Sequence, residues 1–180
     1  MDVTKLSDHY SVRKLSPADA GDIYRLCSKN KIFYQFHPPF ATKESILEDM
    51  EALPPHKDYK DKYYVGFFKG HSLLAVLDLI LDYPKEKTAY IGFFMMEAAF
   101  QGTGIGSGII HECASYLQEL GYQDIRLAID KGNPQSEAFW TKNGFHKTGE
   151  EFPNETSSYL PMEKALPLTS QSSTGILSVR

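Results

Sequence analysis

The eight residues QGTGIGSG, Gln101 to Gly108, decide the fold because they join a buried strand to an amphipathic helix. The run before them, residues 88–96, is apolar on both faces, as is typical of the centre of a sheet. The helix after them is expected from about Gly104 to Leu120, with Gly121 as its end. Four glycines in one turn cost roughly 0.5–1 kcal/mol each relative to alanine, so we expect a close backbone approach to require them.

This turn is suited to hold a phosphate group. The first N–H groups of a helix have no partner inside the helix and lie at the positive end of its dipole, so a diphosphate stabilises them. Two common phosphate motifs do not match. Residues 102–108 lack the lysine of a nucleotide-hydrolase loop, and the Gly-x-Gly-x-x-Gly spacing places Ser107 or Ile109 where the third glycine belongs. A merely tight turn would need only one or two glycines.

The rest of the chain alternates helical and strand patterns. Ser16 and Pro17 are typical of a helix start, as are Thr42 and Ser45. Residues 31–40 are rich in aromatic side chains but contain two prolines, so we expect a loop there. Three strand-like runs, at residues 63–68, 72–81 and 88–96, follow one another with short connections and indicate an antiparallel meander. Strands are expected at 10–14, 63–68, 72–81, 88–96, 124–130, 145–150 and 158–164, with further helices at about 17–30, 42–53 and 135–142.

Length and composition fit one domain. The chain has 180 residues, of which we assign 1–166 to the domain, and it needs no metal and no disulfide. Residues 167–180 are rich in serine and threonine, so we expect a disordered tail. A net charge of −4 without a basic stripe argues against nucleic acid as a partner. We find no apolar run for a membrane span and no secretory signal, so we expect no membrane partner and a cytoplasmic location.

Two motifs resemble those of the GNAT superfamily of acetyl-CoA-dependent N-acetyltransferases. The family's coenzyme-binding turn, Gln/Arg-x-x-Gly-x-Gly/Ala, is matched by Gln101, Gly104 and Gly106. Its second motif begins with Asn after the next strand and ends in an aromatic residue, a spacer and Gly-Phe. Asn133, Trp140 and 144–145 follow that pattern. The resemblance covers roughly residues 8–166, and its two motifs occur in the family's order.

The resemblance implies an α/β (α+β) fold with a GNAT-like, mixed and mostly antiparallel sheet of about seven strands, flanked by about four helices. It also implies direct transfer of an acetyl group from acetyl-CoA to a primary amine in a ternary complex. The strand before the glycine turn would separate from its neighbour and use the amides of Met95 and Met96 to bind the pantetheine arm and the thioester oxygen. Further coenzyme contacts are expected from Gln101, Gly102, Thr103, Gly104, Ile105, Gly106, Ser107, Asn133, Ser136 and Trp140.

The sequence leaves the base open. An alkyl amine is mostly protonated at neutral pH, so a base or a desolvating pocket must free it. Many relatives carry a glutamate in the strand before the motif asparagine, where this chain has Ala128. Our candidates are Glu97 at a strand end, then Asp78 inside an apolar run, then His37 in the aromatic segment.

The acid and the acceptor pocket are also only partly indicated. Relatives commonly have a tyrosine where this chain has Trp140, whose indole cannot release a proton, so water or Tyr159 is expected to protonate the leaving thiolate. In this fold the first two helices and their connection usually wall the acceptor. The aromatic side chains there either contact the acceptor or cover the core. The expected acceptor contacts are Phe33, Tyr34, Phe36 and His37, with Phe40 nearby.

We expect the acceptor to be a small molecule, because an aromatic wall under a net-acidic surface suits a small amine. A protein N-terminus or lysine is the alternative substrate. This chain has Ala128 and Trp140 at the two positions where relatives carry their proton-transfer residues. A non-catalytic regulator that binds acyl-CoA is therefore the main alternative to an enzyme. A nucleotide-binding oxidoreductase is a more distant third. Dimers are common among such enzymes, so a homodimer is left open.

Overall fold

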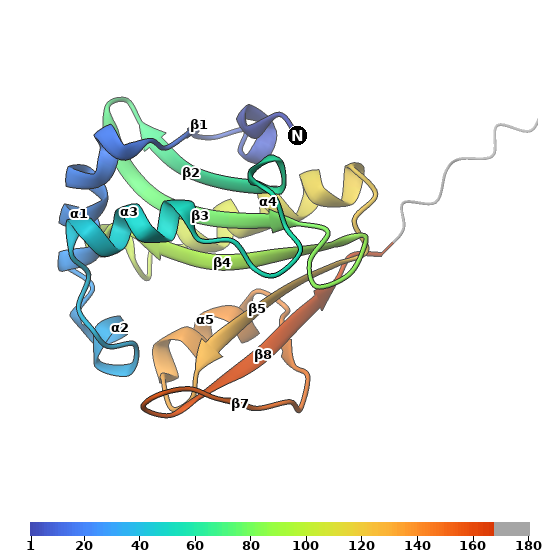
Figure 1. Cartoon of the computed structure of the whole chain (residues 1–180). Helices are drawn as coiled ribbons and strands as arrows, with labels where there is room; N and C mark the ends of the chain where they lie inside the picture. Colours follow the sequence, from blue (N-terminus) through green and yellow to red (C-terminus); the bar gives the residue numbers. More distant parts are fainter. Residues whose placement is uncertain (168–180) are drawn as a thin grey trace, which may run out of the picture.

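The computed structural model describes residues 1–167 (Figure 1). The tail expected to be disordered lies outside the described residues, apart from its first residue. The strands are β1 (Ser11–Lys14), β2 (Lys62–Lys69), β3 (Ser72–Leu81), β4 (Thr88–Met96), β5 (Asp124–Asp130), β6 (His146–Lys147), β7 (Phe152–Pro153) and β8 (Ser158–Ala165). The α-helices are α1 (Ala20–Ser28), α2 (Lys31–Phe36), α3 (Lys43–Glu51), α4 (Ile105–Glu119) and α5 (Pro134–Lys142).

Within this part of the chain the eight strands form one mixed sheet in the order β1-β2-β3-β4-β5-β8-β6, with β7 paired to β8. Every pairing is antiparallel except that of β4 with β5. The expected meander and the central position of the strand at 88–96 are therefore confirmed. The eighth strand arises because β6 and β7 are both two-residue segments on β8.

Helices cover both faces of the sheet. In Figure 1, α3 lies in front of the strands, α1 lies to their left and α4 lies behind them. One core joins α4 to the rear face, and its buried members include Ile109, Ile110, Cys113, Leu117, Phe67, Leu77 and Ile125. The other joins α1 and α3 to the front face through Ile23, Leu26, Ile46, Tyr64, Val76 and Met95. Among residues 1–167 no helix combines the length and the apolar character of a membrane span.

The segment 31–40 differs from the expected loop, because Lys31–Phe36 forms the short helix α2. Proline disturbs the residues at and just before its own position, so the prolines at 38 and 39 end this helix without preventing it. Phe33 packs edge-on against Phe93 of β4 and against Tyr34, with ring centroids 6.1 and 5.0 Å away. These tertiary contacts stabilise a helix that has no side-chain cap at its start.

The strand expected at 145–150 is also shorter than predicted. Only His146 and Lys147 pair with β8, opposite Glu163 and Met162. Gly149 has a φ of +89°, a left-handed conformation that takes the chain out of the extended form. The pairing of this segment with the last strand is nevertheless as expected.

The central strands β4 and β5 run side by side for only part of their length. Their register extends from Thr88↔Asp124 to Ile91↔Leu127. Beyond that point β4 continues on β3, and β5 continues on β8 as far as Asp130↔Tyr159. Figure 1 shows the two strands together at one end and apart at the other, where α2 lies nearby. The sheet therefore opens into a wedge at its centre.

Candidate active site

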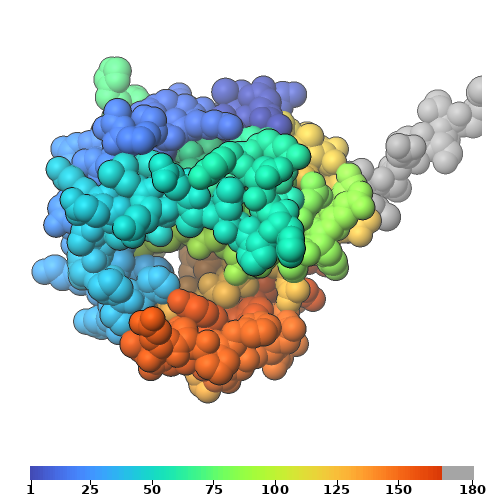
Figure 2. Space-filling view, in the orientation of Figure 1, coloured from blue at the N-terminus to red at the C-terminus, as the bar shows by residue number. Residues whose placement is uncertain are grey.

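A cavity of about 570 Å³ lies in the opening between β4 and β5. Its walls come from the ends of these two strands, from the first turn of α4, from α5 and from the α1–α2 region. In Figure 2 the surface is hollowed between the segment that follows α1, in light blue to teal, and the β7 region, in orange. Thirteen of the predicted site residues line the cavity: Phe33, His37, Met95, Met96, Gln101, Gly102, Gly104, Gly106, Ser107, Asn133, Ser136, Trp140 and Tyr159.

The backbone of β4 directs alternate residues towards β3 and towards the opening. The Glu97 N–H donates to the Leu74 carbonyl at 2.8 Å, on the β3 side. Met95, two residues earlier, is directed the same way, because N–H groups along a strand alternate in direction. The backbone N–H and carbonyl of Met96 are directed towards the opening instead. There the carbonyl accepts from the Asn30 side-chain amide at 3.0 Å. The N–H of Phe94 is directed the same way as that of Met96.

This alternation corrects the expectation that the amides of Met95 and Met96 act together. Consecutive residues of a strand cannot direct both N–H groups to one side. The amides at the opening are those of Phe94 and Met96, although the Met95 residue still contributes to the cavity wall. Sequence periodicity locates the strand, but it does not say which of its residues bond to β3.

The first turn of α4 presents unpaired amides beside the cavity. The Gly108 N–H bonds to the Gly104 carbonyl at 3.0 Å, so the N–H groups of residues 105–107 precede the helical ladder. Gly104 itself has a φ of +91°, which glycine adopts without strain. Because Gly104, Gly106 and Ser107 also line the cavity, the turn has the donors and the backbone exposure that an anion requires.

Gly106 serves a different purpose from Gly104. A β-carbon on Gly106 would lie 2.5 Å from Met96 Sδ and 3.3 Å from the Phe139 ring, so the missing side chain lets α4 approach β4 and α5. The side chains of Thr103 and Ile105 lie outside the cavity wall. The Thr103 hydroxyl donates to a main-chain carbonyl at 2.6 Å, and Ile105 packs against the core.

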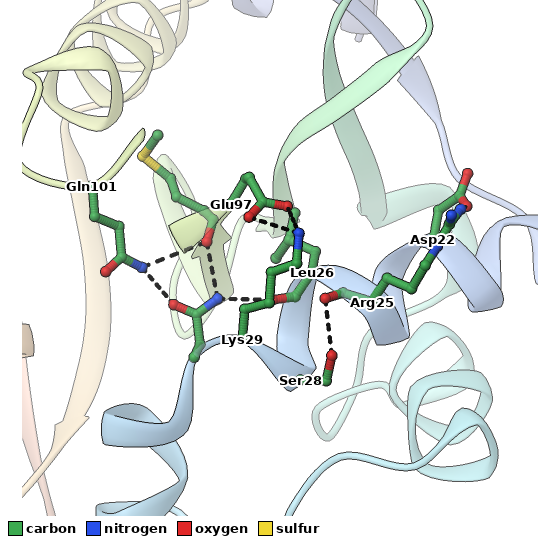
Figure 3. A network of polar contacts seen from close by, with 9 residues as sticks. Asp22, Arg25, Leu26, Ser28, Lys29, Glu97 and Gln101 are labelled. Carbon is green, nitrogen blue, oxygen red and sulfur yellow. Dashed lines mark hydrogen bonds and ion pairs between the residues drawn. The ribbon is translucent and has the colours of Figure 1, made fainter. Parts of the chain in front are cut away.

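Gln101, in the turn before α4, bonds to three other parts of the cavity wall, and Figure 3 shows its contacts with the α1–α2 connection and with the end of β4. Its Nε2 donates to Asn30 Oδ1 and lies 3.5 Å from the Met96 carbonyl, while its Oε1 accepts from Gln135 at 3.0 Å. The Asn30 amide also donates to the Leu26 carbonyl at 2.9 Å. Asn30 lines the cavity, but an asparagine at a helix end is so common that the sequence carried no signal for this position.

Two of the predicted bases lie outside the cavity wall, each paired with a lysine. Both carboxylate oxygens of Glu97 accept from Lys29, at 2.9 and 3.1 Å (Figure 3). Asp78 accepts from Lys62 at 2.7 Å, and burial raises the pKa of Asp78 while Lys62 opposes the shift. Asp78 lies behind Gly92, because a β-carbon on Gly92 would be 2.9 Å from Asp78 Oδ2. Both oxygens of Glu97 are thus engaged, whereas Asp78 Oδ1 is buried without a hydrogen-bond partner among residues 1–167 and lies outside the cavity wall.

The third predicted base, His37, lies in the cavity wall and contacts a carboxylate that sequence reasoning missed. His37 Nδ1 is 3.1 Å from both oxygens of Asp130, the last residue of β5. Asp130 is paired in register with Tyr159 of β8, whose ring centroid is 6.3 Å from that of His37. The hydrogen bond with Asp130 raises the pKa of His37, against the opposing effect of burial. A carboxylate at the end of an apolar strand, just before Asn133, was the available signal.

The α5 side of the cavity combines structural and binding roles. Asn133 caps α5, because its Oδ1 accepts from the Ser136 N–H at 3.1 Å. Trp140 is buried and packs on Phe94 and Phe139 with ring centroids 5.9 and 5.0 Å away. Trp140 therefore belongs to the core and to the cavity wall at once.

The four predicted acceptor residues divide into two groups. Phe33 and His37 line the cavity, whereas Tyr34 and Phe36 do not. Tyr34 packs against the core on the α1 side of the sheet, and its ring centroid lies 4.5 Å from that of Phe40. Phe36 lies against the loop after β5, with its ring 4.0 Å from where a β-carbon on Gly132 would be. Tyr34 and Phe36 thus hold α2 in place, while Phe33 and His37 face the open space.

A family model for the acetyltransferase (GNAT) family matches residues 24–145, and the chain belongs to this family. No curated protein sequence matches the chain at a significant level.

Solved structures with the same fold include three acetyltransferases. One is an acetyltransferase from Thermus thermophilus, 20% identical, with a TM-score of 0.70 over 87% of this chain and 97% of that chain. The PaiA N-acetyltransferase of Thermoplasma acidophilum, in complex with coenzyme A, is 19% identical, with a TM-score of 0.62 over 87% and 98%. A spermidine N-acetyltransferase chimera that includes Vibrio cholerae sequence is 17% identical, with a TM-score of 0.65 over 87% and 95%. At these identities the likeness shows the fold.

Proposed function

We propose that this protein transfers the acetyl group of acetyl-CoA directly to a primary amine of a small molecule. The observation that carries the proposal is a single cavity that reaches both the α4 helix start and the α2 aromatic residues. Because β4 passes between them, a coenzyme held on the α4 side and an amine held on the α2 side meet at the Met96 amide.

The residues present fit coenzyme A. The N–H groups of 105–107 would bind its pyrophosphate, and Gly104 leaves the approach open. The pantetheine arm would then lie between β4 and α5, beside Asn133, Ser136 and Trp140. The coenzyme A complex of the Thermoplasma acidophilum enzyme, which shares this fold, supports the choice of coenzyme.

The Phe94 and Met96 amides would stabilise the reaction itself. Negative charge develops on the thioester oxygen when an amine attacks the carbonyl carbon, and N–H donors aimed at that oxygen lower the barrier. Loss of one such donor costs about 3–4 kcal/mol in comparable sites. Tyr159 lines the same cavity and is our candidate, with water, for returning a proton to the departing sulfur.

A small amine suits the cavity better than a protein segment. The acceptor side is enclosed by α2, and Phe33 and Phe93 form an aromatic surface there. Polyamines and amino-acid derivatives would fill such a space, and the spermidine N-acetyltransferase chimera of the same fold is consistent with that class. Protein amines are the second substrate class of the assay below. A homodimer and a cytoplasmic location stay predictions.

The test is a thiol-release assay with acetyl-CoA and a panel of polyamines, aminoglycosides, amino-acid derivatives and peptides. We expect turnover with small amines and none with Gly104→Val, because a side chain at a φ of +91° is strained and extends towards the phosphate. Gly108→Ala is the matched control, since its N–H is already bonded in the helix and its β-carbon position is open.

Binding and turnover separate the alternatives. Coenzyme binding without turnover on any amine would favour the regulatory module, and turnover on peptides alone would replace the small-molecule acceptor. Unchanged coenzyme affinity in Gly104→Val would contradict the placement of the coenzyme at α4.

A further inference from the structure

We propose that His37 accepts the proton of the acceptor's ammonium group and that Asp130 positions the His37 ring for this step. The inference rests on the proposed function and assigns its base. His37 follows α2 and Asp130 ends β5, so the pair joins the two sides of the wedge across the cavity.

The hydrogen bond determines which nitrogen of His37 meets the substrate. Nδ1 is equidistant, at 3.1 Å, from the two oxygens of Asp130, so it donates its proton to the carboxylate. Nε2, on the opposite edge of the ring, then carries the lone pair. The base is therefore available in the correct tautomer before an amine enters.

The partner carboxylate is itself held firmly. Asp130 is in strand register with Tyr159, and its side chain is only 7% exposed. Phe33 packs against the His37 ring with centroids 5.2 Å apart, and Phe36 lies against the loop after β5. Contacts on both sides thus fix the ring at the cavity wall, with the side chain of His37 still 43% exposed to meet a ligand.

Competing carboxylates lack this arrangement. Both oxygens of Glu97 are engaged by Lys29, and Asp78 is paired with Lys62 behind Gly92. The cavity wall at Ala128, where many relatives have a glutamate, offers only a methyl group. Of the three bases that the sequence suggested, His37 is the one whose residue lines the cavity.

The ammonium group R–NH₃⁺ gives one proton to His37 Nε2, and the nitrogen lone pair then attacks the thioester carbonyl carbon. The C–S bond breaks with its electron pair on sulfur. The second proton lost from nitrogen goes to the thiolate through Tyr159 or water, and imidazolium His37 returns its proton to solvent. The imidazolium is stabilised meanwhile by the charge of Asp130.

The pH dependence follows from the groups around His37. Asp130 of β5 and Asp49 of α3 raise the pKa of His37, burial lowers it, and Tyr159 of β8 lies next to the ring. Neutral His37 is the active form, so kcat/KM falls as the pH drops through that pKa. Removing the Asp130 charge lowers the pKa, and the acid limb of the profile must then move to lower pH.

The experiment compares His37→Gln and Asp130→Asn with the wild type, using the best amine from the panel. Coenzyme affinity by calorimetry reports correct folding. We expect kcat to fall about 10²–10⁴-fold in His37→Gln with little change in coenzyme affinity. We expect Asp130→Asn to lower the plateau value of kcat/KM. We also expect the fall of kcat/KM on the acid side of the pH profile to move to lower pH. The exposed residues His71 and Asp8 supply controls, and His71→Gln and Asp8→Asn should leave both parameters unchanged.

The outcomes distinguish this inference from the proposed function. A wild type that acetylates no amine overturns both. The assignment of the pair is overturned if the wild type is active and His37→Gln keeps the wild-type kcat. It is also overturned if the acid side of the pH profile of Asp130→Asn stays where it is in the wild type. Either result leaves the proposed acetyltransferase activity intact.

Discussion

The glycines of the α4 turn show that two neighbouring positions can need the same residue for different reasons, while a third position does not need it. Gly104 supplies a backbone conformation with a φ of +91°. Gly106 supplies space, because Met96 Sδ and the Phe139 ring lie where its β-carbon would be. Gly108 meets neither constraint: it lies within α4, with open space around its β-carbon position. A single count of glycines does not separate these roles.

Stability measurements on alanine variants can separate Gly106 from Gly108. Gly106→Ala forces the Met96 side chain to move, and overpacking of this kind costs about 1–3 kcal/mol. Gly108→Ala should raise the free energy of unfolding by about 0.5–1 kcal/mol, because alanine loses less backbone entropy in a helix. Urea unfolding curves measure both changes. Equal stability of the two variants would show that the close approach of α4 to β4 is not as described.

At the scale of elements, α2 has the clearest link to function. It brings Phe33 against Phe93 and His37 against Asp130, so it forms the acceptor wall on the side opposite α4. Its helical form depends on these contacts more than on its own sequence, since the side chain of Asn30 at its start accepts no capping hydrogen bond. Changes in α2 should therefore affect the amine and spare the coenzyme.

A comparison within α2 tests this division. We expect Phe33→Ala to raise KM for the amine about ten- to a hundredfold, the equivalent of losing the burial of one aromatic side chain. Coenzyme affinity should stay the same. Ile32→Ala is the matched control, because Ile32 lies in the same helix and is 51% exposed. A rise in the coenzyme Kd with an unchanged amine KM would place the two ligands the other way round.

At the scale of the whole molecule, the charge favours cationic acceptors. The chain carries a net charge of −4, and the carboxylates Asp49 and Asp130 both act on His37 at the acceptor side. Such a field attracts a cation over distances comparable with the Debye length, and salt weakens it.

Ionic strength should therefore discriminate among amines. We expect KM for a triamine to rise severalfold as salt increases from about 0.02 M to about 0.3 M. KM for a monoamine that carries no other charged group should change little. Steady-state rates at constant pH measure this, with the Kd of coenzyme A recorded in parallel as a correction. Identical salt dependence for the two amines would show that the protein's field does not select the acceptor.

The sequence by itself determined the strand order as far as the meander, the glycine turn and most helix starts, because each depends on residues a few positions apart. The Thr42 and Ser45 cap pair at α3 is an example. Only the tertiary structure decided the direction of the β4 amides, the helical form of α2 and the pairing of His37 with Asp130. Those two residues are 93 positions apart, and the sheet order brings them together across a wedge that no local pattern encodes.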